Sequence, residues 1–200
     1  LPLTWRLRLF PTCTRHGRVL LDACTGCGAP YQPHRGGMRH CDRCGLDLTL
    51  LDAPTADPNV LTLQAHNEAV LDGRAVAWPY LHGMHPIAFF SMQLALFRAI
   101  TSRGWGERVR NALQSSIGSL ELEYRAKTPS IRSMTISSAH DAMRGVERLL
   151  RGWPFGLVGL CGEARAWASW IVPEETGVQT PFALREALDT YLRPGSSNAR

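Results

Sequence analysis

The sequence is poor in lysine, in long apolar runs and in secretion signals, and each absence argues against a class of protein. Lys127 is the single lysine among 22 basic residues, and there is no Gly-Lys-Ser/Thr sequence, so a phosphate-binding loop is excluded. No apolar run approaches the ~18 residues of a membrane span. Residues 1–10 contain two arginines and no long apolar core, so we do not expect a signal peptide. These absences predict a cytoplasmic protein without membrane contact.

Cysteine, in contrast, is concentrated. Four of the six cysteines lie within residues 20–48, as two Cys-x-x-Cys-Gly sequences with thirteen residues between Cys27 and Cys41. Disulfide frameworks are typical of short secreted chains, so this spacing favours a metal site. Zinc takes four tetrahedral ligands, and we predict one structural Zn²⁺ in a zinc ribbon, held by Cys24, Cys27, Cys41 and Cys44. Iron in a rubredoxin-like site and four free cysteines are the alternatives. The glycine after each pair suits a turn with positive φ.

A third pair, Cys13 and His16, lies just upstream as Cys-x-x-His. It could complete a site with Cys24 and Cys27, but Cys41 and Cys44 would then have only His34 or His40 as partners. The simpler interpretation gives the four later cysteines one ion. Cys13 and His16 then belong to a second site whose other two ligands precede Leu1, so we expect the natural protein to begin upstream. A buried cysteine beside an exposed histidine is the plain alternative.

These motifs resemble those of the TniQ family, the target-selection proteins of bacterial cut-and-paste and CRISPR-associated transposons. The resemblance covers about fifty residues, WRLRLFPTCTRHGRVLLDACTGCGAPY…RHCDRCGLDL, and a looser likeness continues in LLRGWPFGLVGL. The matching positions are Trp5, Cys13, His16, Gly17, Leu20, Leu21, Cys24, Cys27, Gly28, Cys41, Cys44 and Gly45. Thr14 stands where the family usually has proline, and the family's upstream Cys-x-x-Cys is missing, which puts the first zinc site in doubt.

The resemblance implies a non-catalytic adaptor in DNA transposition. Such a protein recognises a target, either DNA or a guide-RNA effector complex, and recruits the transposon's AAA+ ATPase. Arg35, Arg39 and Arg43 would contact phosphate or an acidic partner, although a solvated face explains them equally well. A helix-turn-helix within 105–171 is expected because relatives that read DNA carry one. A homodimer is among the open oligomeric states.

The net charge is compatible with an adaptor that contacts nucleic acid but does not by itself indicate one. Residues 1–50 carry seven Arg and three Asp, and the remaining 150 residues carry 15 basic and 14 acidic side chains. Zinc on four thiolates would subtract about two charges from the first segment. The N-terminal segment is therefore mildly basic, which is compatible with nucleic acid.

We predict a mainly α fold: a small N-terminal zinc-ribbon β module over 1–52, a multi-helix bundle over 60–193 and a disordered tail over 194–200. The Pro/Asp-rich residues 51–59 form the boundary. Apolar spacing and stop signals place helices at 60–72, from Pro86 to about Gly104, around 109–117, at 138–150 and at 155–171, with a loop at 121–136. Thr180 and Pro181 cap a last helix that extends to Leu192. In the second helix, the predicted buried face consists of Ile87, Phe90, Leu94 and Phe97.

Two other functions were weighed against the adaptor. One is a zinc-ribbon transcription regulator unrelated to transposition. The other is a metalloenzyme that uses His66, His82 and His85, but Gly83 and Pro86 place that motif in a loop and no Glu stands at a general-base spacing. We predict that Cys161 is a core residue, as are the tryptophans Trp153, Trp167 and Trp170.

Overall fold

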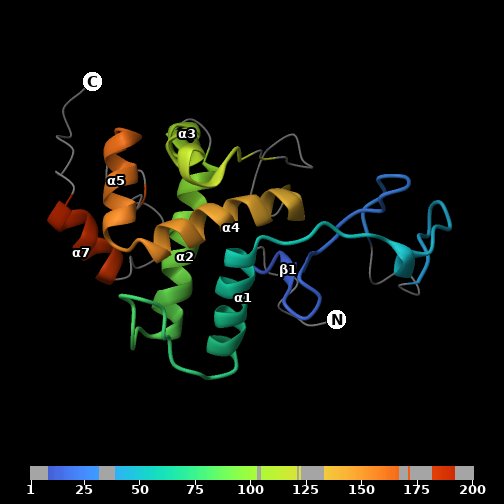
Figure 1. The fold of residues 1–200 in the computed structure, drawn as a ribbon, viewed down its shortest axis with the longest axis horizontal. Helices are drawn as coiled ribbons and strands as arrows, with labels where there is room; N and C mark the ends of the chain where they lie inside the picture. Colours follow the sequence, from blue (N-terminus) through green and yellow to red (C-terminus); the bar gives the residue numbers. More distant parts are fainter. Residues whose placement is uncertain are drawn as a thin grey trace.

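The structure, a computed structural model, describes residues 9–31, 39–102, 105–120, 122, 133–166, 171 and 182–191. Within these residues the fold is mainly helical, as predicted, with a two-stranded antiparallel sheet near the N-terminus (Figure 1). The elements are β1 (Thr12–Cys13), β2 (Arg18–Val19), the 3-10 helix η2 (Leu48–Leu50), α1 (Pro58–Leu71), α2 (Pro86–Thr101), α3 (Trp105–Ile117), α4 (Ile136–Arg151), α5 (Phe155–Glu163) and α7 (Phe182–Tyr191). Trp167, Trp170, His34 and the predicted tail lie outside the described residues.

The core forms where α4 crosses α2 (Figure 1). Helix α4 is buried around most of its circumference, and Gly145 is the residue that allows the close approach. A Cβ at that position would lie 2.7 Å from Ile100 Cδ1 on α2 and 3.1 Å from Leu113 Cδ1 on α3. The two neighbouring helices therefore pack directly against the backbone of α4. Cys161 and Trp153 are part of this core, as predicted.

The helices begin at local capping signals. Pro58 and Pro86 open α1 and α2, where a missing N–H costs nothing, and Asp57 and His85 cap the free N–H groups of the first turns. Helix α4 begins at Ile136 instead of at Ser138. Thr135 is its N-cap, because the Thr135 hydroxyl accepts a 3.2 Å hydrogen bond from the Ser138 N–H.

The structure corrects two sequence predictions about helices. The predicted face of α2 is right only in part: Phe97 is buried and Phe90 is partly buried against the core, but Ile87 is 71% exposed. The fully covered side of α2 consists of Phe89, Met92, Gln93, Leu96, Phe97, Ala99 and Ile100. The reason is that α2 is apolar around most of its circumference, so its neighbours decide which side is covered. Helix α5 ends at Glu163, not Ile171, because Arg165 adopts φ 49° and Ala166 N–H bonds back to Cys161 O at 2.8 Å. That arrangement is a Schellman-type end without the usual glycine.

The β1–β2 hairpin packs on the helices. Phe10 is 1% exposed, and Thr12 N–H and hydroxyl both donate to Gln64 Oε1 on α1. Residues 51–57 return alongside the hairpin, where Val19 N–H donates to Pro54 O at 2.8 Å and Ala56 N–H to Gly17 O at 3.0 Å. The described part of segment 1–52 therefore has two parts. The hairpin packs on the helical body, and the segment with the four cysteines extends away from that body (Figure 1).

None of the described helices combines the length and the hydropathy needed to cross a bilayer.

Candidate metal centre

The two Cys-x-x-Cys-Gly sequences fold into two turns with the same backbone pattern. In the first, residues Ala23 and Pro30 bridge the two sides, Cys24 N–H donates to Ala29 O, and Gly28 N–H donates to Cys24 O. The second turn repeats every one of these contacts seventeen residues later: the bridge joins His40 to Asp47, Cys41 N–H donates to Leu46 O, and Gly45 N–H donates to Cys41 O. Gly28 (φ 69°) and Gly45 (φ 72°) have the predicted positive φ, and an added Cβ would meet nothing within 4 Å. Glycine is needed there for backbone conformation alone.

The two turns bring four sulfurs together. Cys24 Sγ lies 3.6 Å from Cys44 Sγ and Cys27 Sγ lies 3.7 Å from Cys41 Sγ, and all four sulfurs lie within 4.8 Å of one another. A tetrahedral ion with metal–sulfur distances of about 2.3 Å requires sulfur–sulfur separations of about 3.8 Å. All four cysteines are free of disulfides. The arrangement therefore fits one tetrahedral metal ion.

The electrostatics of the four thiols also favour a cation. Backbone N–H groups of Arg43 and Cys44 lower the pKa of Cys41 to about 7. The Leu46 N–H lowers the pKa of Cys44, but burial and hydrogen bonds with the other three thiols raise it to about 12. Burial, followed by the charges of the four cysteines, raises the pKa of the Tyr31 hydroxyl, which is buried without a described partner. Four thiolates at this spacing need a compensating divalent charge.

Cys13 and His16 form a third turn of the same design. Thr12 pairs with Val19, Gly17 N–H donates to Cys13 O at 2.9 Å, and Gly17 has φ 63°. Each contact matches one in the first cysteine turn eleven residues later. Cys13 Sγ lies 3.2 Å from His16 Nδ1, so two potential ligand atoms converge. Sequence reasoning noted the pair but not that its backbone repeats the cysteine turns.

This third turn belongs to the helical body and not to the four-cysteine cluster. The Thr14 hydroxyl donates to Glu68 Oε2 on α1 at 2.8 Å, and Glu68 Oε1 accepts from Gln64 Nε2 at 3.0 Å. Among the described residues, the four cysteines are the only group of three or more His, Cys, Asp or Glu side chains close enough to share an ion. Cys13 and His16 therefore do not complete a site with Cys24 and Cys27. No local sequence signal pointed to Gln64 or Glu68, which reach the turn only through the fold.

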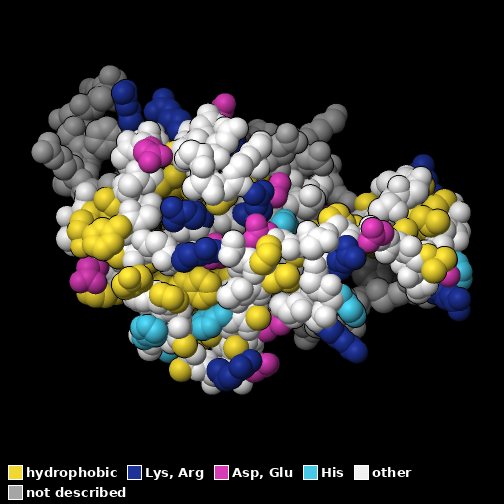
Figure 2. Space-filling model, viewed as in Figure 1, with side chains coloured by type: hydrophobic (Ala, Val, Ile, Leu, Met, Phe, Trp, Pro, Cys, Tyr) yellow, Lys and Arg dark blue, Asp and Glu magenta, His cyan; other side chains and the backbone are white. Residues whose placement is uncertain are grey.

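The arginines predicted to contact a partner lie on the outside of the ribbon. Arg39 is exposed, and its Nε lies 3.5 Å from Asp47 Oδ2. Arg43 is exposed between Cys41 and Cys44, and Arg35 lies outside the described residues. Figure 2 shows Arg side chains on the ribbon and across the middle of the helical body, with carboxylates between them. The surface is mixed in charge on the face shown.

The three histidines of the metalloenzyme alternative do not converge. His85 caps α2, since its Nδ1 accepts from Ile87 N–H at 3.2 Å. His66 is packed edge-on against Trp78 and Phe89, with ring centroids 5.5 Å apart in both cases. Burial and Arg74 lower the pKa of His66, so its ring is neutral at pH 7. His66 and His85 thus have structural contacts, and His82 is exposed in the turn before α2.

Comparisons with protein-family models, with curated proteins and with solved structures find no match to this chain.

Proposed function

We propose that Cys24, Cys27, Cys41 and Cys44 hold one structural Zn²⁺ and that the chain is a non-catalytic adaptor in DNA transposition. The observation that carries the zinc part of the proposal is the convergence of the four sulfurs within 4.8 Å of one another. Catalytic zinc keeps one position open for water or substrate, whereas four cysteine ligands fill all positions. Zinc would thus supply folding free energy to a ribbon too small to form a core of its own.

The transposition role rests on the motif resemblance. The TniQ-like pattern uses two Cys-x-x-Cys-Gly turns preceded by a Cys-x-x-His-Gly turn, and the three turns here share one backbone geometry. Cys13 and His16 would supply two ligands of a further zinc ion. On this proposal the chain recognises a target, as DNA or as a guide-RNA effector complex, and recruits an AAA+ ATPase. It would act in the cytoplasm, and its assembly, as a monomer or a homodimer, is open.

Helix α3 supports direct contact with duplex DNA. Three residues separate the end of α2 from the start of α3, and α3 runs across the end of α2 (Figure 1). We propose these two helices as a helix-turn-helix pair, which begins upstream of the predicted range 105–171. Val109 and Leu113 face the core, while Asn111, Gln114 and Ser115 share the exposed face. Asn and Gln pair with adenine in the major groove, and Ser bonds to several bases. By contrast, α5, which also follows a short turn, presents Phe155, Gly159, Gly162 and Glu163 outward and carries no cation.

The proposal is tested by two binding experiments with the zinc-loaded chain. The first is a pull-down with the AAA+ ATPase encoded beside it. The second measures affinity for duplexes selected from a random-sequence pool as salt is raised. Replacement of Arg35, Arg39 and Arg43 by Ala should lower the salt slope, because each lost phosphate contact releases fewer counterions. Asn111→Ala with Gln114→Ala should reduce sequence preference and leave that slope unchanged.

Arg185→Ala provides the control, because Arg185 is exposed on α7 and belongs to neither proposed contact surface. Failure to bind the ATPase, any selected duplex and any guide-RNA complex would reject the adaptor proposal. Binding of duplex DNA without the ATPase would favour the alternative function, a zinc-ribbon transcription regulator. The exposed face of α3 supports this alternative as well, because a transcription regulator would also bind DNA through it.

A further inference from the structure

The chain on both sides of the cysteine ribbon is attached to the N-terminal half of α4. At the entry, Asp22 Oδ2 accepts a 3.0 Å hydrogen bond from Ile136 N–H, the first residue of α4. On the exit side, ten residues after the last cysteine turn closes at Asp47, Asp57 N–H donates to His140 Nε2 at 3.1 Å, a histidine that is 9% exposed. The segments that enter and leave the ribbon are therefore held at two points on a single helix.

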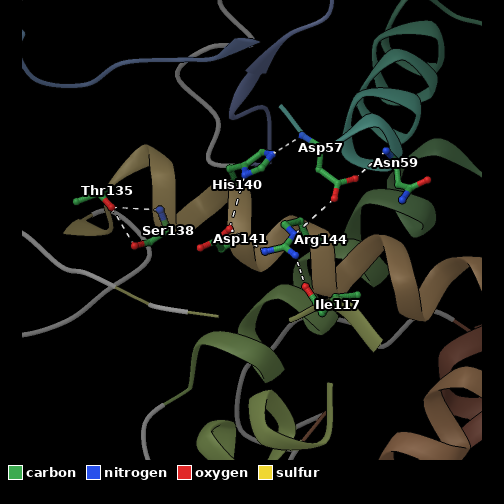
Figure 3. Close-up of polar contacts among 8 residues, drawn as sticks. All are labelled: Asp57, Asn59, Ile117, Thr135, Ser138, His140, Asp141 and Arg144. Atoms are coloured by element: carbon green, nitrogen blue, oxygen red, sulfur yellow. Dashed lines mark hydrogen bonds and ion pairs between the residues drawn. The ribbon is translucent and has the colours of Figure 1, made fainter. Parts of the chain in front are cut away.

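Arg144 extends this attachment to α3. Its Nε lies 3.6 Å from Asp57 Oδ2, and its Nη1 lies 3.4 Å from Asp141 Oδ1 (Figure 3). Its Nη2 donates to the backbone carbonyl of Ile117, the last residue of α3. The side chains of Arg144, Asp57 and Asp141 are 24, 28 and 26% exposed, so these contacts are largely shielded from water. One guanidinium thus contacts the ribbon exit, α4 and the end of α3.

Asp57 has two functions at this point. Its Oδ1 caps α1 by accepting from Asn59 N–H at 2.8 Å, and its Oδ2 faces Arg144 (Figure 3). A charged, partly buried hydrogen bond to a helix C-terminus is stronger than a neutral one, and it also complements the helix dipole. Movement of the ribbon exit would therefore change the charge balance at the end of α3.

We infer that Asp57 and Arg144 form a joint that couples the linker leaving the cysteine ribbon, at the N-cap of α1, to the C-terminal turn of α3. The contacts themselves are independent of any function. Their consequence rests on the proposed function, in which the ribbon and α3 are the two contact surfaces: a partner that reorients the ribbon would alter α3, and DNA on α3 would alter the ribbon.

Hydrogen exchange of the zinc-loaded 200-residue chain tests the joint. In α3, the Gly118 N–H donates to Gln114 O at 2.9 Å and reports on the last turn. Asp57→Asn keeps an N-cap side chain but loses the charge that faces Arg144. We expect this variant to speed exchange at 115–118 several-fold, because Asp57 acts on that turn through Arg144. Arg144→Gln should speed exchange about tenfold both there and at the Asp57 amide.

Arg148→Gln is the matched control, one turn farther along the same exposed edge of α4, and should change neither region. If Arg144→Gln does not fold, Asp57→Asn decides the question alone. Unchanged exchange at 115–118 in Asp57→Asn would overturn the inference, because Arg144 would then be only a local cap of α3. Faster exchange together with absent DNA binding would leave the joint intact and reject the proposed function instead.

Discussion

Asn67 on α1 and Gln93 on α2 exchange two hydrogen bonds of 2.8 Å, and both side chains are fully buried. Each amide satisfies the other, so the pair tolerates an apolar surrounding that would penalise either one alone. Asn67→Ala or Gln93→Ala should each cost about 1–3 kcal/mol in the free energy of unfolding, measured in urea. The double replacement should cost clearly less than the sum of the two, and additive costs would contradict the reciprocal pairing.

The metal content of the chain is the second prediction. Elemental analysis should find close to one zinc per chain, and X-ray absorption should show four sulfur neighbours at about 2.3 Å. Cys41→Ser should remove most of the bound zinc, because three cysteines and a water bind it much less tightly. Cys161→Ala removes a thiol from the core of the helical body and should leave the zinc content unchanged. A reduced preparation with disulfides among the four cysteines would contradict the site.

His16 provides a sharper test of how the ligands are paired. Two protein ligands bind zinc far more weakly than four, since water replaces the missing ligands. His16→Ala in this 200-residue chain should therefore keep the zinc count near one and change stability by no more than about 0.5 kcal/mol. A second, tightly held zinc that disappears in His16→Ala would show that Cys13 and His16 bind an ion within this chain.

Gly145 should be intolerant of even one added carbon. Gly145→Ala places its Cβ 2.7 Å from Ile100 Cδ1, so we expect a loss of about 1–3 kcal/mol despite alanine's better helix propensity. Ile100→Val removes that Cδ1 and should recover part of the loss in the double variant. Gly159→Ala on α5 is the control: nothing lies within 4 Å of the added carbon, and stability should rise by about 0.5–1 kcal/mol. Equal effects at both glycines would contradict the packing of α4.

His66 should make the chain less stable in acid. Burial, and then Arg74, lower its folded-state pKa below the ordinary 6.5. Below about pH 6.5 the unfolded chain therefore binds a proton that the folded chain does not, and this contribution is lost as pH falls. Glu147 has the opposite effect on stability. Burial raises its pKa, so at pH values just above its ordinary pKa of 4.5 the folded chain binds a proton that the unfolded chain does not.

The Glu147 contribution is the same in every variant, so it cancels when the change in stability between two pH values is compared between variants. The urea-measured stability difference between pH 7 and pH 5 should shrink in His66→Gln. It should stay as in the wild type in His82→Gln, whose imidazole is exposed. An unaltered difference in His66→Gln would mean that His66 does not carry the acid sensitivity.

The cysteine turns could be predicted from local sequence. Ligand spacing, the glycine with positive φ and the closing hydrogen bonds all lie within eight residues, from Ala23 to Pro30 and from His40 to Asp47. The start of α2 at Pro86 was predictable for the same reason, because a cap and a proline act on the next turn only. Helix α1 begins at Pro58, two residues before the predicted start, because Asp57 and Pro58 supply the same kind of signal within the segment predicted to be a linker. The choice of zinc, the partners and the role in transposition stay predictions.

Only the tertiary structure decided which surfaces meet. The buried face of α2 depended on α1, α3 and α4, and the end of α5 depended on an arginine, not a glycine, taking positive φ. Thr12 with Gln64, Asn67 with Gln93 and Asp57 with His140 are separated by 52, 26 and 83 residues. No local pattern specifies such pairs, because a buried polar group is stable only when the fold brings its partner within hydrogen-bond distance.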